Sequence, residues 1–388
     1  IIININYAIF DSVLRVIMIY KKSNNIEVKK INKNIIYKYI LEKDKISKLD
    51  IALGLNMSMP TVLHNVKELL KNNLVKEFGE FQSSGGRKAK AISIVADARL
   101  SIGINITKNH ISLVLVDLSG KLIKHIRLKN SFSYDENYFL WFNKSINEFV
   151  EGIDINKILG AGVSIPGIID KSGTDIANSY VLGFGKVPYS DFTKYIPFEC
   201  IFINDANAAG FAEARYIENN SLYLSLSNSV GGAIIFSKQL YNGDNIRSGE
   251  FGHMCIVPNG LKCYCGKIGC LDSYCRANLL SDLTNGKLGD FFKELDSGNK
   301  DFLKIWNDYL YYLSIAVNNL RMAFDCDIII GGYVGGYFEK YIDDFKEKVA
   351  KLNTFETNGN YVKACKHHFE AAALGAALQH IYSFINKI

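Results

Sequence analysis

The chain has 388 residues, of which 48% are hydrophobic and 22% are charged, and its formal net charge is +6. A chain this long and this apolar has material for two or three compact units and is not a disordered segment. The positive charge is concentrated near the N-terminus, because residues 26–95 hold 13 Lys and Arg against 7 Asp and Glu, whereas residues 96–388 hold 29 against 31. We therefore predict a basic domain over 26–95 and a near-neutral body over 96–388.

Residues 1–25 are rich in isoleucine, but Asn4, Asn6, Asp11 and Arg15 interrupt the apolar stretch. A membrane span needs about 20 consecutive apolar residues, and a signal peptide needs basic residues first and a small-residue cleavage site. We therefore predict an N-terminal extension without an assigned role, no membrane association and a cytoplasmic protein.

The region after this extension carries three predicted helices. Apolar residues recur at helical spacing over 32–43. Ser47 with Asp50 three residues later forms a capping box for a second helix, and Ser58 can cap a third, with Pro60 in its first turn. Two helices, a tight turn and a third helix are typical of a helix-turn-helix, whose last helix enters the major groove of DNA.

In the third predicted helix, the apolar stripe faces the core and the polar residues face outward. Thr61, His64 and Asn65 are therefore candidates for base edges, and Lys67 is a candidate for phosphate. The strand–loop–strand pattern over 74–95 predicts a wing, which places Arg87 in the minor groove of A·T-rich DNA and Lys88 on phosphate. The candidate DNA-binding residues are Ser58, Thr61, His64, Asn65, Lys67, Arg87 and Lys88. The alternative is a small three-helix domain that binds protein.

The body begins with a predicted β-meander from Leu100, with a turn at 118–120. Buried strands then alternate with helices, and several strands end in glycine or polar residues. This pattern predicts an α/β fold with ligands bound at the strand ends.

A compact set of metal-ligand residues lies between Glu250 and Cys275. The four candidate ligands are His253, Cys263, Cys265 and Cys270. Zinc prefers four such thiolate and imidazole ligands in a tetrahedron, and the glycines between them allow the chain to fold back. We predict a structural zinc site, and the alternative is a set of buried cysteines beside a loop histidine.

Several motifs resemble the ROK family of sugar kinases and sugar-responsive repressors, and within it the xylose-repressor type. They are SMPTV and SSGGRK in the basic domain, SIPG at 164–167, NDANAA at 204–209, GEFGH at 249–253, CYCGKIGC at 263–270 and IIIGG at 328–332. The resemblance implies a winged helix-turn-helix ahead of an actin-like (ribonuclease-H-like) two-lobed body. The first lobe would take in about 96–204 plus the C-terminal helix 369–386, and the second lobe about 205–368.

The resemblance also implies a set of sugar-binding residues: Pro166, Gly167, Asn204, Asp205, Glu250, His253 and Asp272. Asp205 stands at the position of the general base of the kinases, and its alternative role is a helix cap. His253 would use one ring nitrogen for zinc and the other for the sugar. Asp272 replaces a glutamate of the family and is one methylene shorter.

The phosphate-binding motifs of the family are changed in this chain. Residues 105–109 read NITKN where the kinases have Asp-x-Gly-Gly-Thr, and residues 227–232 keep only the later glycines of the second loop. Phosphoryl transfer depends on positioning and stabilising the phosphates and their metal ion. We therefore predict a sugar sensor without catalytic residues.

The leading hypothesis is a transcriptional repressor that binds a palindromic, A·T-rich operator as a homodimer or homotetramer and responds to a sugar. Xylose is the first candidate effector, ahead of glucose and N-acetylglucosamine. One alternative is an ATP-dependent sugar kinase with an accessory DNA-binding domain. A second alternative is a zinc-responsive regulator, in which the metal is the signal.

Overall fold

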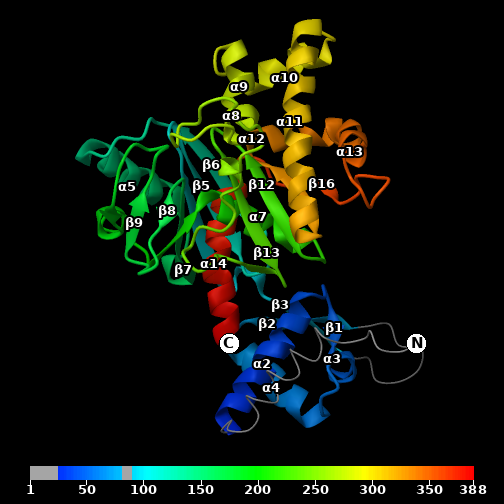
Figure 1. Ribbon diagram of the computed structural model, residues 1–388. Helices are drawn as coiled ribbons and strands as arrows, with labels where there is room; N and C mark the ends of the chain where they lie inside the picture. The colour runs from blue at the N-terminus through cyan, green and yellow to red at the C-terminus, as the bar shows by residue number, and fades with distance from the viewer. Residues whose placement is uncertain (1–24, 81–89) are drawn as a thin grey trace. The chain divides into compact units, whose positions relative to one another are not determined.

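The computed structural model describes residues 25–80 and 90–388, and the chain divides into two units. The first unit contains the described residues up to Arg99 together with Tyr382–Ile388, and the second contains Leu100–Ile381 (Figure 1). In the described residues, no helix is long and apolar enough to span a membrane.

The first unit consists of three N-terminal helices and a small sheet. The helices are α2 (Asn25–Leu41), α3 (Lys48–Gly54) and α4 (Met59–Lys71), and the strands β1 (Ile46–Ser47), β2 (Val75–Glu80) and β3 (Lys90–Ile94) lie in the order β1-β3-β2. Both predicted caps are present: Ser47 Oγ accepts a hydrogen bond from Asp50 N at 3.1 Å, and Ser58 Oγ accepts one from Thr61 N at 3.3 Å. The caps satisfy amides that have no partner within their helices.

The last residues of the chain also belong to the first unit. Asn34 donates a hydrogen bond from its side chain to the carbonyl of Ile385, and Lys38 Nζ lies 2.8 Å from Asn386 Oδ1. The predicted division of the chain placed the whole C-terminal helix in the body. Contacts between residues this far apart in the chain leave no signal in local sequence, and the predicted domain bounds stay a prediction.

The second unit begins with a five-stranded sheet that forms the first lobe. Its strands are β4 (Leu100–Ile106), β5 (His110–Asp117), β6 (Leu122–Lys129), β7 (Ile158–Ile165) and β11 (Cys200–Asn204), in the order β11-β7-β4-β5-β6. The first three form the predicted antiparallel meander, while β7 and β11 run parallel to β4. Helix α5 (Glu136–Val150) buries its apolar face against this sheet. The lobe also contains β8 (Ile168–Ile169), β9 (Asp175–Asn178), β10 (Val187–Pro188) and α6 (Ser190–Thr193).

The second lobe is built on another five-stranded sheet, in the order β14-β13-β12-β15-β16. Its strands are β12 (Ser221–Leu226), β13 (Val230–Phe236), β14 (Gln239–Leu240), β15 (Asp327–Gly331) and β16 (Val362–Ala364). The large core beside it is formed mainly by the long helix α11 and its neighbours. The helices are α8 (Asp272–Cys275), α9 (Asn278–Ser281), α10 (Leu288–Asp296), α11 (Lys300–Phe324), α12 (Gly332–Gly335) and α13 (Ile342–Ala350).

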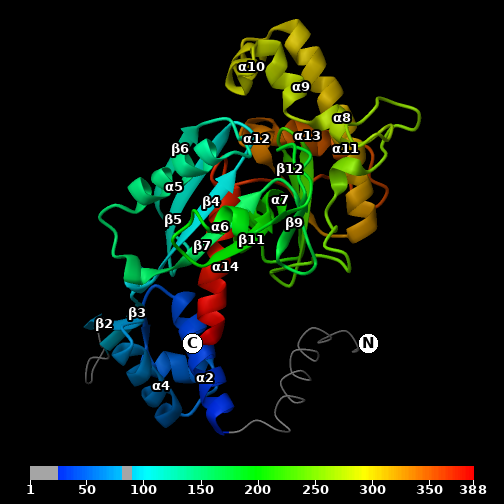
Figure 2. The same cartoon turned by 90° about the vertical axis from the view of Figure 1, so that its left-hand side faces the viewer.

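Two helices lie between the sheets and join the lobes (Figure 2). α14 (Ala371–Lys387) packs on the first sheet, where a Cβ at Gly103 would lie only 1.9 Å from Ala373 O. α7 (Asp205–Glu213) packs on the second sheet through Gly210. The two helices meet backbone to backbone, since a Cβ at Gly375 would lie 1.7 Å from Ala208 O. Only glycine allows this approach, which fixes the start of α7 relative to both sheets.

Candidate functional site

A cavity of about 600 Å³ lies in the second unit, beside the ends of β7 and β11. Six of the seven residues predicted to bind sugar line it: Pro166, Gly167, Asn204, Asp205, Glu250 and His253. Their positions agree with the expectation that ligands of α/β sheets bind where strands end. The seventh, Asp272, does not line this cavity.

Asn204, the last residue of β11, is the cap of α7. Its Oδ1 accepts hydrogen bonds from Ala206 N at 3.0 Å and Asn207 N at 3.1 Å, and its Nδ2 donates to Gly167 O at 3.1 Å. The sequence left open whether Asp205 was a cap or a cavity residue. Because Asn204 caps the helix, the carboxylate of Asp205 is left at the cavity.

Asp205 is the first residue of α7, and its Oδ1 also accepts a hydrogen bond from Ala206 N at 3.0 Å. Burial raises the pKa of Asp205 to about 6, and the nearby carboxylate of Glu250 adds to the effect. Burial raises the pKa of Glu250 as well, although His253 and Arg247 oppose that shift. Two carboxyl groups with raised pKa values in one cavity form a site suited to binding hydroxyl groups.

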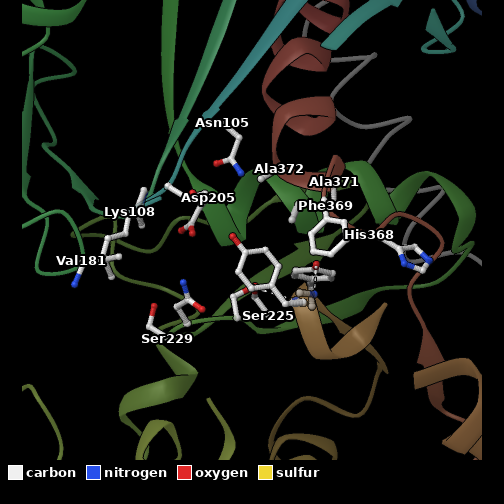
Figure 3. Close-up of a pocket in the computed structure, with 18 residues that line it drawn as sticks. Asn105, Lys108, Val181, Asp205, Ser225, Ser229, His368, Phe369, Ala371 and Ala372 are labelled. Carbon is white, nitrogen blue, oxygen red and sulfur yellow. Dashed lines mark hydrogen bonds between the residues drawn. The ribbon is translucent and has the colours of Figure 1, made fainter. Parts of the chain in front are cut away.

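A second, much smaller cavity of about 50 Å³ lies on another side of Asp205 (Figure 3). Both altered phosphate motifs face it, through Asn105, Thr107 and Lys108 and through Ser227, Asn228 and Ser229. This volume is enough for a few water molecules, because one water needs roughly 10–15 Å³ measured this way. The volume of this cavity is about one-twelfth of that of the large cavity.

Aromatic side chains take up the space around this small cavity. The rings of Tyr333 and Phe369 lie 5.6 Å apart, and the guanidinium of Arg127 lies 4.3 Å from the ring centre of Phe369. Burial raises the pKa of Tyr333, which is mostly enclosed. Neither aromatic residue was predicted from the sequence, although Tyr333 directly follows the IIIGG motif at the end of a buried strand.

The four predicted zinc ligands come together. The ligand atoms of His253, Cys263, Cys265 and Cys270 all lie within 4.8 Å of one another. Two of the separations are 3.8 Å, between the Sγ atoms of Cys265 and Cys270, and 3.9 Å, between Cys263 Sγ and His253 Nδ1. A tetrahedron with zinc–ligand bonds of roughly 2.1–2.3 Å has edges of about 3.4–3.8 Å, so these two separations are close to those of a zinc site.

His253 connects this cluster to the large cavity. Its Nδ1 faces the cysteines, whereas its Nε2 lies 3.3 Å from the hydroxyl of Tyr264 and 4.0 Å from Glu250 Oε2. The histidine therefore has one nitrogen available to a metal ion and the other at the cavity. Binding of zinc by one nitrogen and of a sugar by the other stays a prediction.

Asp272 lies behind the cavity wall. Its carboxylate is fully buried and accepts a hydrogen bond from Val230 N, the first amide of β13, at 2.7 Å. Its other oxygen has no hydrogen-bond partner in the described part of the chain, and Arg276 lies 3.9 Å away. Contact between Asp272 and a sugar stays a prediction, whereas its position supports a role in holding the wall.

The candidate DNA-binding residues of α4 differ in exposure. Ser58, His64 and Lys67 are exposed, and Thr61 is half-buried. Asn65 is only 3% exposed, and its Nδ2 donates to Thr61 O at 2.8 Å. The prediction that Asn65 faces outward was therefore wrong, because its amide is satisfied inside the helix. Arg87 and Lys88 lie outside the described residues.

Comparison with known proteins decides the family. The ROK family matches residues 101–381. The chain belongs to the ROK family. The xylose repressor of Bacillus spizizenii is 33% identical to this ROK protein over 322 residues, which cover 78% of this chain and 82% of that one. The NagC regulator of Escherichia coli K12 is 26% identical over 259 residues, covering 63% of this chain and 62% of its own length.

Solved structures show the same fold. A ROK transcriptional regulator described as a homologue of the E. coli Mlc protein aligns with a TM-score of 0.72 at 18% identity, covering 92% of this chain and 98% of the other. A ROK glucokinase from Streptomyces griseus aligns with a TM-score of 0.63 at 21% identity, covering 72% of this chain and 98% of its own. The predicted actin-like α/β fold is thereby confirmed for this ROK protein.

Proposed function

We propose that this protein is a sugar-responsive transcriptional repressor whose kinase-like body senses a sugar without phosphorylating it. The observation that carries this proposal is the contrast between the two sides of Asp205. The side lined by Glu250 and His253 is an open cavity of about 600 Å³, whereas the side of the former phosphate motifs is a cavity of about 50 Å³ beside Tyr333 and Phe369. The large cavity has room for a sugar ring, whereas the cavity at the altered phosphate motifs has about one-twelfth of its volume.

Two features support the choice of a repressor over a kinase with an accessory domain. The xylose repressor of Bacillus spizizenii covers most of this chain, so xylose is the first candidate effector. The first unit has the helix-turn-helix arrangement, with a basic stretch over 26–95. The protein binds a palindromic, A·T-rich operator as a homodimer or homotetramer, as most helix-turn-helix regulators require matching half-sites.

The proposal includes a structural zinc ion, held by His253, Cys263, Cys265 and Cys270. Zinc would supply a rigid link between these four residues, with no position left open for chemistry. A signalling role for zinc would require a site that exchanges the ion readily. A four-ligand site of three cysteines and one histidine favours a permanent ion, which argues against the zinc-responsive alternative.

The test combines sugar binding with operator binding. We expect one sugar from a panel of xylose, glucose and N-acetylglucosamine to raise the melting temperature, because it binds only the folded state, and to release operator DNA in a mobility-shift assay.

Lys67→Ala should weaken operator binding and reduce the salt dependence of the binding constant by the equivalent of about one phosphate contact, whereas Lys144→Ala on α5 should change neither. ADP release above background with any of these sugars would favour the kinase.

Sugar affinity should depend on pH through Asp205. The carboxylate form accepts hydrogen bonds from sugar hydroxyls, and the pKa of this group is about 6 in the free protein. Between pH 7 and pH 5, the ionised fraction falls about tenfold, so affinity should fall by about the same factor. Titration calorimetry at several pH values measures this change, and a flat profile would show that the ionised form of Asp205 is not needed.

A further inference from the structure

Two tyrosines of the large cavity have no role in the function proposed above. Tyr180 is 69% exposed and Tyr264 is 46% exposed, and both line the cavity. Their ring centres lie 6.2 Å apart, at an interplanar angle of 55°. Tyr180 comes from the first lobe and Tyr264 from the second. Neither ring contributes to a core, so their exposure at a cavity points to a ligand.

Tyr264 is fixed by the cysteine cluster. It stands between Cys263 and Cys265 in the chain, its hydroxyl lies 3.3 Å from His253 Nε2, and its ring meets the imidazole edge-on at 5.4 Å. The imidazole nitrogen that faces the cavity is therefore directly beside this ring. A ligand that reaches His253 and Glu250 and extends further must pass Tyr264.

Tyr180 is also held in place, although its ring is exposed. It lies in a tight turn in which Gly183 N donates to Ser179 O at 2.8 Å. The fully buried hydroxyl of Ser179 donates to the carbonyl of Pro166, a residue of the cavity wall, and accepts from Leu182 N at 3.2 Å. The turn is thus tied to the same wall that carries the sugar-binding residues, which positions the Tyr180 ring before any ligand arrives.

The size and lining of the cavity leave room for more than one sugar ring. Its volume of about 600 Å³ lies within the range of about 300–1,000 Å³ that accommodates drug-sized ligands. Polar side chains continue beyond the carboxylates, since Asn178, Asn242 and Arg247 also line it. The loop that carries Arg247 holds Ile246 at φ 54°, a conformation that a β-branched residue rarely adopts outside functional sites.

We propose that the effector is a disaccharide. Its first ring binds at Asp205, Glu250 and His253, and its second ring packs on the faces of Tyr180 and Tyr264. Tyrosine suits this role because its ring covers the C–H face of a sugar. This inference rests on the proposed function, and it adds the chemical class of the effector.

The test compares each monosaccharide with its β-1,4-linked disaccharide by titration calorimetry on the full-length protein. The pairs are xylose and xylobiose, glucose and cellobiose, and N-acetylglucosamine and chitobiose. We expect one disaccharide to bind at least tenfold more tightly than its monosaccharide. A monosaccharide that binds as tightly as its disaccharide would overturn the inference but leave the sugar-responsive repressor intact. If none of the six sugars binds, the proposed function fails and the inference fails with it.

Variants locate the second ring. Tyr180→Ala should weaken binding of the disaccharide about threefold to tenfold, the usual loss for one aromatic contact, and leave binding of the monosaccharide unchanged. Tyr264→Phe keeps the ring and should keep the preference for the disaccharide. Tyr311→Ala removes a tyrosine of α11 whose exposure (57%) lies between those of Tyr264 and Tyr180, and it serves as the control. If Tyr180→Ala weakens both sugars equally, the tyrosines close over a single ring and the proposal is wrong.

Discussion

Asp205→Asn is expected to abolish the sugar response and leave operator binding unchanged. The carboxylate lies at the start of α7, where Asn204 already caps the helix, so its loss leaves the local fold intact. An amide accepts hydrogen bonds with one oxygen only and carries no charge, and we expect at least a hundredfold loss of sugar affinity. Calorimetry and operator release by sugar measure the two effects. If sugar still releases the variant from the operator normally, Asp205 is not a sugar-binding residue.

The same variant should be more stable than the parent protein in the absence of sugar. Burial raises the pKa of Asp205 from 3.8 to about 6, so the ionised form costs about 2–3 kcal/mol of folding free energy at pH 7.5. Below about pH 3 the carboxyl group is largely protonated in both states and the difference disappears. Asparagine has no charge to bury, and the melting temperature of the variant should exceed that of the parent at pH 7.5 but match it near pH 3.

Asp308→Asn, at an exposed position on α11, is the matched control and should change neither stability nor sugar binding. If Asp205→Asn proves less stable than the parent at pH 7.5, contacts within the protein offset the cost of burying the carboxylate. The carboxylate then has a structural role and is not a group that a ligand stabilises. A site that costs stability until its ligand binds is a common property of binding sites. The two measurements together therefore separate a functional carboxylate from a structural one.

Local sequence signals predicted the parts of the structure that depend on neighbouring residues. The caps at Ser47 and Ser58, the meander from Leu100 and the turn at 118–120 follow from side-chain chemistry and spacing within a few residues. The cysteine cluster was predictable for the same reason, since its four members lie within 18 positions. The placement of Asn204 and Asp205 at a strand end also followed from the α/β pattern.

The burial of single side chains and the contacts between distant segments were not predictable in this way. Asn65 was expected to face outward from its helical position, but its amide bonds to Thr61 O within the helix. Tyr333 and Phe369 are 36 positions apart, and only the folded second lobe brings them together beside Asp205. The loss of the phosphate motifs was visible in the sequence, whereas the packing of these two aromatic rings beside the altered motifs was not. Packing of this kind depends on the whole fold.

Removing one cysteine of the cluster is expected to disturb the sugar site before it disturbs the first unit. Cys265→Ser leaves three ligands, and an incomplete tetrahedral site holds zinc far more weakly. His253 then loses its fixed orientation, and Tyr264, which lies beside Cys265 in the chain and 3.3 Å from His253 Nε2, loses its anchor. We expect at least a tenfold loss of sugar affinity and a lower melting temperature for the second unit.

Cys255→Ser is a closely matched control. Cys255 belongs to the same loop, is exposed, and lies outside the group of four ligand residues. It should leave sugar affinity, metal content and stability unchanged. Measured metal content should be one zinc ion per chain for the parent and for Cys255→Ser, and well below one for Cys265→Ser. A Cys265→Ser protein with full metal content would show that the assigned ligand set is wrong.

The zinc experiment also distinguishes a structural ion from a signal. If zinc only holds the cavity wall, adding or chelating it within a physiological range leaves operator affinity unchanged when no sugar is present, because the ion does not exchange. The sugar then acts by binding one conformation more tightly than the other, which is the only way that a ligand can shift the equilibrium between them. Reversible switching of operator affinity by zinc alone would make the cluster the sensor. In that case His253, which faces both the metal and the cavity, would carry the signal.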